Sequence, residues 1–392
     1  MMKRTLIRCV MLFFVGIAAI HAGATEPWNG EPGVVHLASP APGGRYDGFM
    51  VHRDDGSVIM FGAKEARLSI SAGDTWGEPF KLRTADDKEI SHNCRAALKL
   101  QSDKIGLVTG RQGEHYFQTS ADGGRTFGGP TPITAQGVRK PHYRSQITQL
   151  KSGRIIIPFY EFCGRRNSEQ TWKRAPWSWS AMCYSYVVYS DDEGQTWHQS
   201  EDDVVIVPAY WAPGHTETFA AFEEPTVVEL KDGRLMILGR NRMGRLFESF
   251  SMDQGVHWSI AEPTELAASY APAELRRIPS TGDLLICWNQ VSKQEIVDGL
   301  NRHRLSVAVS VDEGKTWGNY KNLYSLDDYN YVRPDPPQII VPGEKWVEII
   351  RKNGGPLEVL GRGAIGRKTS TCCRRTDRDT IASRPVAEPV IR

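Results

Sequence analysis

The stretch Ser310–Trp317, "SVDEGKTW", contains the pattern that decides the fold, because the chain repeats it. Its Asp accepts backbone N–H bonds across a bend, and its Gly supplies the positive φ that a tight turn needs. The closing Trp is a large apolar side chain that locks the turn against its own sheet. The octet therefore indicates a turn between two β-strands. The other copies are Ser69–Trp76, Ser120–Phe127, Ser190–Trp197 and Ser251–Trp258.

A second pattern precedes the octets and consists of an apolar strand, a turn and another apolar strand. Alternation and β-branched residues mark these segments as hairpins, as in "TVVELKDGRLMIL" (Thr226–Leu238). A sixth hairpin, Pro337–Ile350, has no octet after it. Five repeats and a partial sixth predict an all-β protein, a six-bladed β-propeller with an imperfect last blade. The first octet has Ser71 in place of the Asp, so we expect a weaker turn there.

The two ends of the chain do not follow this repeat. Lys3 and Arg4 precede the apolar run Cys9–Ile20, and small residues follow, which is typical of a secretory signal peptide. We interpret residues 1–24 as this signal, 25–350 as the propeller and 351–392 as a poorly ordered or divergent tail. We expect an exported protein, periplasmic or extracellular, without a membrane span once the signal is cleaved. An uncleaved anchor is the alternative.

The amino-acid composition indicates which classes of binding partner to expect. Lys and Arg total 48 and Asp and Glu total 46, a balance that argues against nucleic acid or an anionic membrane. The seven cysteines are scattered and have no zinc-ligand spacing, so we predict neither a metal nor another cofactor. Cys163 and Cys183 flank one loop and could pair, or remain as two buried thiols. We expect a monomer that binds a glycan or glycoconjugate.

The octets resemble the Asp-boxes of the sialidase (neuraminidase) superfamily of six-bladed propellers. The resemblance covers roughly Gly43–Ile350 and is strongest at Glu223–Ser259 and Tyr270–Asn289, which look like bacterial secreted proteins with BNR repeats. It implies that the octets lie on outer turns, away from the axis of the ring. It also implies an exo-glycosidase that releases sialic acid or a related acidic sugar with retention. Such an enzyme uses three Arg for the sugar carboxylate, a Tyr nucleophile with a Glu, and an Asp as general acid.

Three of these roles have matching positions in the second half of the chain. Glu224 and Arg240 bracket an antiparallel hairpin, so both return to one end of its sheet and match the family's Glu and second Arg. A surface ion pair is the competing interpretation. For the third Arg we choose Arg302 over Arg304. For the nucleophile we choose Tyr331 over Tyr329, because Tyr331 is closer to the following strand; a packing tyrosine is the alternative.

The first half of the chain matches the family less closely. Arg45 stands at the place of the first Arg, and Arg144 is a further candidate for substrate contact. The loop Gly62–Leu68 lacks the family's Asp, which leaves Asp47 as a displaced general acid or Glu65 as a substitute. The missing Asp keeps two alternatives open, a glycosidase of altered specificity and a carbohydrate-binding propeller without catalysis.

Overall fold

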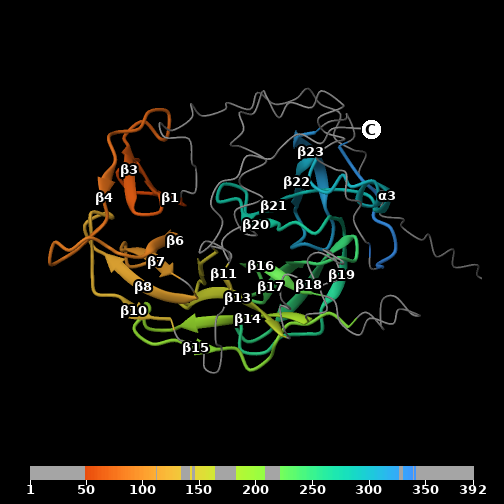
Figure 1. Cartoon of the computed structure of the whole chain (residues 1–392), viewed down its shortest axis with the longest axis horizontal. Coiled ribbons are helices and arrows are strands. Elements are labelled where there is room, and N and C mark those ends of the chain that lie inside the picture. Colours follow the sequence, from red (N-terminus) through yellow and green to blue (C-terminus); the bar gives the residue numbers. More distant parts are fainter. Residues whose placement is uncertain are drawn as a thin grey trace, which may run out of the picture.

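The structure is a series of antiparallel β-sheets arranged around a common centre (Figure 1). The computed structural model describes residues 49–111, 113–133, 142–143, 146–163, 182–207, 221–325, 330–338 and 340. Within these ranges five blade sheets form, and their strands lie side by side in the order of the sequence, except that β11 and β12 both pair with β13 in the third sheet. The predicted all-β propeller is therefore confirmed, and we number its blades in chain order.

The strands of the first three blades are mostly short. Blade one contains β1 (Phe49–His52), β2 (Val58–Phe61), β3 (Glu65–Ser69) and β4 (Phe80–Lys81). Blade two contains β6 (Asn93–Lys99), β7 (Ile105–Arg111), β8 (Glu114–Ser120) and β10 (Thr131–Pro132). Blade three contains β11 (His142–Tyr143), β12 (Thr148–Gln149), β13 (Ile155–Cys163), β14 (Met182–Ser190) and β15 (His198–Gln199).

The remaining elements complete the described part of the ring. Blade four contains β16 (Glu223–Glu229), β17 (Leu235–Arg240), β18 (Arg245–Ser251) and β19 (Glu262–Ala267). Blade five contains β20 (Glu274–Arg277), β21 (Leu284–Trp288), β22 (Leu305–Ser310) and β23 (Gly318–Tyr324). Outside the blades, β5 (Arg83–Thr84) pairs in parallel with β9 (Thr126–Phe127), and α3 (Lys293–Val297) lies between β21 and β22.

The first strands of neighbouring blades are adjacent, since β1 contacts β6 and β16 contacts β20. The hydrophobic core lies between the blades rather than within a single layer. Ile156 and Val187 of blade three, for example, pack with Leu235 and Ile237 of blade four. Similar clusters join blades one and two, two and three, and four and five. Each blade therefore buries its apolar residues against its neighbours, as the alternating strand patterns require.

The prediction of six blades is corrected to five for the part of the chain that the structure describes. After β23, the described residues 330–338 form no strand. Pro334, Pro336 and Pro337 lack the N–H groups that a strand ladder needs. Arg245 holds this segment against blade four, because its Nε donates to the carbonyl of Asp335 (2.6 Å). Most of the hairpin Pro337–Ile350, residues 1–24 and the tail 351–392 lie outside the described residues.

The octet Ser310–Trp317 forms the predicted turn, between the third and fourth strands of blade five. Asp312 accepts hydrogen bonds from the Ser310 hydroxyl (2.8 Å), the Thr316 N–H (2.9 Å) and the Thr316 hydroxyl (2.7 Å). The octets of blades two to four repeat this network. In the first octet the Ser71 hydroxyl accepts from the Thr75 N–H (2.9 Å) instead of a carboxylate. The octet therefore closes the outer edge of a blade.

Each octet of blades two to five also contacts the blade before it. Glu313 accepts a hydrogen bond from the Lys231 N–H (2.6 Å), in the β16–β17 turn of blade four. The Trp317 N–H donates to Glu265 of β19 (2.8 Å). Gly194 has a φ of 87°, and a Cβ there would overlap the ring of Phe117 in blade two. The glycine is thus needed both for its backbone conformation and for the close approach of two blades.

No helix among the residues that the structure describes has the length and apolarity that a membrane span requires.

We predict that Gly194→Ala lowers the free energy of unfolding by about 3 kcal/mol, because left-handed strain and overpacking add. Gly233 is the matched control, since its φ is 89° but nothing lies within 4 Å of a Cβ built there. Gly233→Ala should cost only about 1 kcal/mol. Chemical denaturation of both variants measures the difference, and equal losses would contradict the proposed contact between blades.

The octet carboxylates should make stability depend on acidity. Burial raises the pKa of Asp192, but hydrogen bonds from Thr196, Ser190 and the Gln195 N–H outweigh it and lower that pKa to about 2. The unfolded value is about 3.9. The folded form therefore gains stability from this carboxylate above about pH 4 and loses it as the pH falls through about 2. Between pH 2 and 5, the free energy of unfolding from denaturation curves should fall less steeply with acid for Asp192→Asn than for the natural chain. The same pH dependence in both chains would refute this.

Candidate active site

The hairpin of β16 and β17 brings together the two residues that the sequence pairs. Its strands run antiparallel, with Glu223 directly opposite Arg240. One guanidinium nitrogen of Arg240 lies 2.9 Å from Glu223 Oε2, and the other lies 3.1 Å from Glu224 Oε2. Arg240 is 5% exposed and both carboxylates are 1% exposed. The structure therefore places Glu224 beside Arg240, as a buried ion cluster rather than a surface pair, and adds Glu223 as a second carboxylate.

A β-bulge explains why two consecutive glutamates reach the same guanidinium. In a regular strand, neighbouring side chains point to opposite faces of the sheet. The pairing of β16 with β17 is interrupted between Glu223 and Thr226, and Glu224 has a φ of 45°. This left-handed conformation is costly for a residue with a side chain, and Pro225 follows it directly. Such local strain persists only where the surrounding fold holds it, and strained residues of this kind cluster at functional sites.

Tyr270, in the connection between β19 and β20, completes the group. Its hydroxyl donates a short hydrogen bond to Glu223 Oε1. The guanidinium carbon of Arg240 lies 4.3 Å from the centre of the Tyr270 ring. A tyrosine hydroxyl, a buried carboxylate and a buried guanidinium thus form one connected chain. Sequence reasoning missed Glu223 and Tyr270, although both begin the two segments in which the resemblance is strongest.

Burial sets the protonation of this group. It raises the pKa of Glu223, although Arg240 and the Tyr270 hydroxyl act in the opposite direction. Burial and then the charge of Glu223 raise the pKa of Tyr270 well above its usual value. Burial opposes the charge of Arg240, but Glu224 and Glu223 outweigh it and raise the pKa of the guanidinium. Tyr270 therefore keeps its proton, and Glu223 is a better proton acceptor than an exposed carboxylate.

The two arginines considered before the fifth octet occupy different surroundings. Arg302 is half-buried and donates from Nη2 to the carbonyl of Tyr270 (3.3 Å). Arg304 is 1% exposed and donates to Glu295 of α3 (2.9 Å) and to the carbonyl of Gln290 (2.9 Å). The structure therefore brings Arg302 to the site and places Arg304 in a structural ion pair.

Tyr331 lies elsewhere. Its ring packs against Tyr320 of β23, with ring centres 4.8 Å apart, at the edge of the core between blades four and five. Burial, followed by the charge of Glu265, raises its pKa. The ring contact is with a fourth strand, β23, whereas Glu223 and Glu224 lie on a first strand, β16. The structure does not bring Tyr331 together with these glutamates, because the segment after β23 is held at Gln290, in the β21–β22 connection, which accepts from the Val332 N–H (2.8 Å).

Several predicted residues cannot be placed. Arg45, Asp47, Arg144 and Tyr329 lie outside the described residues. Glu65 is exposed at the start of β3, and its carbonyl accepts from the Gly62 N–H (2.7 Å) in a tight turn. In the described ranges, no group of three or more His, Cys, Asp or Glu side chains could hold a metal ion.

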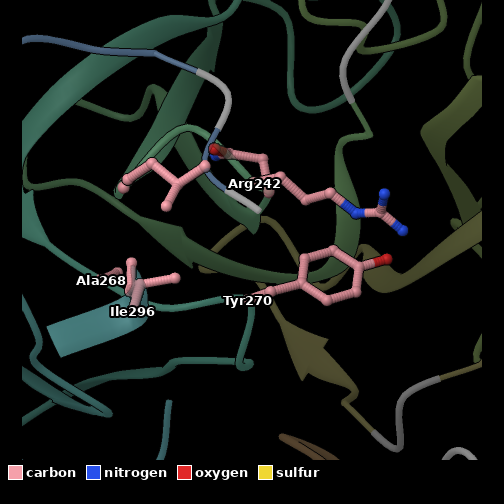
Figure 2. Close-up of a pocket in the computed structure, with 7 residues that line it drawn as sticks. Arg242, Ala268, Tyr270 and Ile296 are labelled. Atoms are coloured by element: carbon pink, nitrogen blue, oxygen red, sulfur yellow. The ribbon is translucent and has the colours of Figure 1, made fainter. Parts of the chain in front are cut away.

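A small pocket lies beside Tyr270 (Figure 2). The guanidinium carbon of Arg242 is 5.2 Å from the centre of the Tyr270 ring. Figure 2 shows the Arg242 guanidinium at the hydroxyl end of that ring. Ile296 of α3 and Ile340 also line the pocket. The site therefore combines a half-buried tyrosine, hydrogen-bonded to a buried glutamate, with cationic and apolar walls.

The five sheets and the repeated octets define an all-β propeller of the BNR-repeat type. A family profile described as "BNR repeat-like domain" matches residues 62–339, more than half of the chain. The chain belongs to this family. The resemblance to sialidase-like proteins with BNR repeats is thereby confirmed.

Solved structures with a similar chain course include both a protein without assigned function and sialidases. A protein of unknown function from Dyadobacter fermentans is 14% identical, with 69% of this chain and 80% of that chain covered and a TM-score of 0.48. Trypanosoma rangeli sialidase is 14% identical, with 68% of this chain and 46% of that chain covered and a TM-score of 0.39. The NanB sialidase of Streptococcus pneumoniae is 16% identical, with 59% of this chain and 32% of that chain covered and a TM-score of 0.37. This chain thus spans less than half of either sialidase. No curated protein matches it.

Removal of Arg240 should destabilise the fold strongly. Arg240→Met leaves Glu223 and Glu224 buried without their cation, which typically costs about 3–5 kcal/mol. Adding Glu223→Gln and Glu224→Gln to this variant should restore part of the loss, because the uncompensated charges are then gone. Urea unfolding of the single and triple variants tests the ion cluster. A single variant as stable as the natural chain would show that Arg240 does not hold the two carboxylates.

Proposed function

We propose that the protein is an exo-glycosidase of sialidase type that hydrolyses terminal sialic acid, or a related acidic sugar, with retention. One observation carries this proposal: the Tyr270 hydroxyl donates to the buried carboxylate of Glu223, which Arg240 holds from the other side. A neutral tyrosine suits an anomeric centre that bears a carboxylate, because an anionic nucleophile would be repelled. The match to the BNR repeat-like family supports the propeller fold on which this chemistry is proposed.

In the first step, the Tyr270 oxygen bonds to the anomeric carbon while its proton passes to Glu223. The bond from the anomeric carbon to the leaving oxygen breaks, and a general acid protonates that oxygen. In the second step, water attacks the anomeric carbon and gives one proton to the conjugate base of that acid. The bond to Tyr270 breaks, and Glu223 returns its proton to the tyrosine. The sum is hydrolysis of one glycosidic bond, with all groups restored.

The remaining roles rest on sequence. We propose Asp47 as the general acid, and Arg45, Arg144 and Arg302 as ligands of the sugar. Of these, Arg302 adjoins Tyr270. Glu224 shares Arg240 with Glu223 and so helps to fix the base. The signal-like residues 1–24 support export to the periplasm or the outside of the cell, which stays a prediction.

A carbohydrate-binding propeller without turnover is the second candidate. It is favoured by the loop Gly62–Leu68, whose only carboxylate, Glu65, is exposed at the start of β3. Binding of an acidic sugar without release of product would select this alternative.

The purified protein should release sugar from sialyllactose or from an aryl glycoside of an acidic sugar. Tyr270→Phe and Glu223→Gln should each reduce kcat by on the order of 1,000-fold, because each removes a member of the reacting pair. Tyr331→Phe is the matched tyrosine variant. Loss of turnover with Tyr331→Phe, and not with Tyr270→Phe, would return the nucleophile to the segment after the fifth octet. No release from any sialoside at high protein concentration would refute the sialidase activity.

A further inference from the structure

A glutamine of blade three holds the end of the β-bulge in β16. Gln146, in the segment that precedes β12, is 1% exposed. Its side-chain oxygen accepts from the Val227 N–H (2.7 Å), and its nitrogen donates to the Val227 carbonyl (3.1 Å) and to the Thr226 hydroxyl (2.8 Å). An amide side chain has an acceptor oxygen and two N–H donors, and β16 engages all of them. Gln146 therefore pairs with Val227 as the backbone of a neighbouring strand would.

The Thr226 hydroxyl extends this contact to a third blade. Thr226 is 0% exposed, and its Oγ1 also accepts from the Leu275 N–H of β20 (3.1 Å). It therefore receives hydrogen bonds from blade three and from blade five, while its own strand belongs to blade four. Because β20 begins shortly after Tyr270, the same hydroxyl ties the strand of Glu223 to the segment that carries Tyr270.

These contacts lie where the bulge ends. Between Glu223 and Thr226, β16 contains one more residue than the part of β17 opposite it. A slip of Thr226 by one residue would remove the bulge and turn the side chains before it to the opposite face of the sheet. Glu223 would then point away from Arg240. Gln146 opposes this slip, because the slip would break its bonds and leave the buried N–H and carbonyl of Val227 unpaired.

We propose that Gln146 is a positioning residue for the reacting pair: by pairing with Val227 it fixes the bulge, and so holds the Glu223 carboxylate at the Tyr270 hydroxyl. For its effect on catalysis this inference rests on the proposed function, whereas the hydrogen bond that it concerns is independent of the reaction. Gln146 acts through the main chain of β16, so its loss disturbs the geometry of the pair without removing a reacting group. A misplacement of about 1 Å reduces turnover on the order of 100-fold.

The test follows the Tyr270 hydroxyl by NMR of the full chain labelled with ¹³C at tyrosine Cζ, because the Cζ shift reports the hydrogen bond of the hydroxyl. Tyr270→Phe assigns the signal, and Glu223→Gln gives its position when the carboxylate is replaced. Gln146→Leu should move the Tyr270 signal from its natural position toward that of Glu223→Gln. The same variant should lower kcat for a sialoside roughly 10- to 100-fold and leave KM nearly unchanged. If Gln146→Leu does not fold, Gln146→Glu, which keeps an acceptor for the Val227 N–H, takes its place with the same expected direction.

Gln118→Leu is the control for the loss of a buried amide. Gln118 of blade two is 3% exposed and donates to a main-chain carbonyl, that of Gly128 (2.9 Å). Its replacement should leave the Tyr270 signal in place.

The outcomes separate this inference from the proposed function. If a folded Gln146 variant keeps the natural Tyr270 signal, the positioning role is refuted, whether or not the chain hydrolyses a sialoside. If Gln118→Leu moves the signal as far as Gln146→Leu does, a general loosening of the fold explains both, and the inference fails. If the signal moves only in the Gln146 variants but the natural chain hydrolyses no sialoside, Gln146 still positions Glu223, and the proposed function fails alone. Denaturation midpoints of the variants verify that each one is folded.

Discussion

The packing of the ring depends on the hydrogen bonds that the carboxylate at the third position of the octet accepts across its turn. Asp312 holds both ends of its turn, and this places Gly314 where a Cβ would be 3.0 Å from Met236 of the preceding blade. The same turn directs Glu313 to the N–H of Lys231. A local hydrogen-bond network therefore also determines how one sheet packs on the next. Because the network recurs in blades two to five, the blades follow one another with similar packing.

This regular framework supports one irregular strand end. The blades hold β16 on both sides, since β16 contacts β13 and β20. A residue with φ of 45° directly before a proline is unfavourable by itself, so the strain at Glu224 depends on that support. The strained conformation allows two adjacent carboxylates to share the guanidinium of Arg240. The bulge thus converts an ordinary hairpin edge into a buried ion cluster with a tyrosine beside it.

The repeat pattern was sufficient to predict the class of fold, the turns and most hairpins, because octets and strands depend on neighbours in the sequence. It also predicted that Glu224 and Arg240 meet. It could not reveal Glu223, whose side chain should point away in a regular strand, nor Tyr270, which reaches Glu223 from the connection between blades four and five. Tyr331 was chosen by its place after the last octet. The prolines after β23, which end strand pairing, explain why the sixth hairpin does not continue the repeat through residues 330–338.

The net charge of the buried group differs from the charge at its edge. With both glutamates ionised, Glu223, Glu224 and Arg240 carry a net negative charge that would repel an acidic sugar. Burial raises the pKa of Glu223 and so reduces that charge in part, but a proton acceptor must still be ionised when it acts. Cations at the edge of the group have to reverse the local potential, and Arg242 and Arg302 both adjoin Tyr270. The buried arginine therefore offsets the two carboxylates from within the group, and the half-buried arginines add positive charge at its edge.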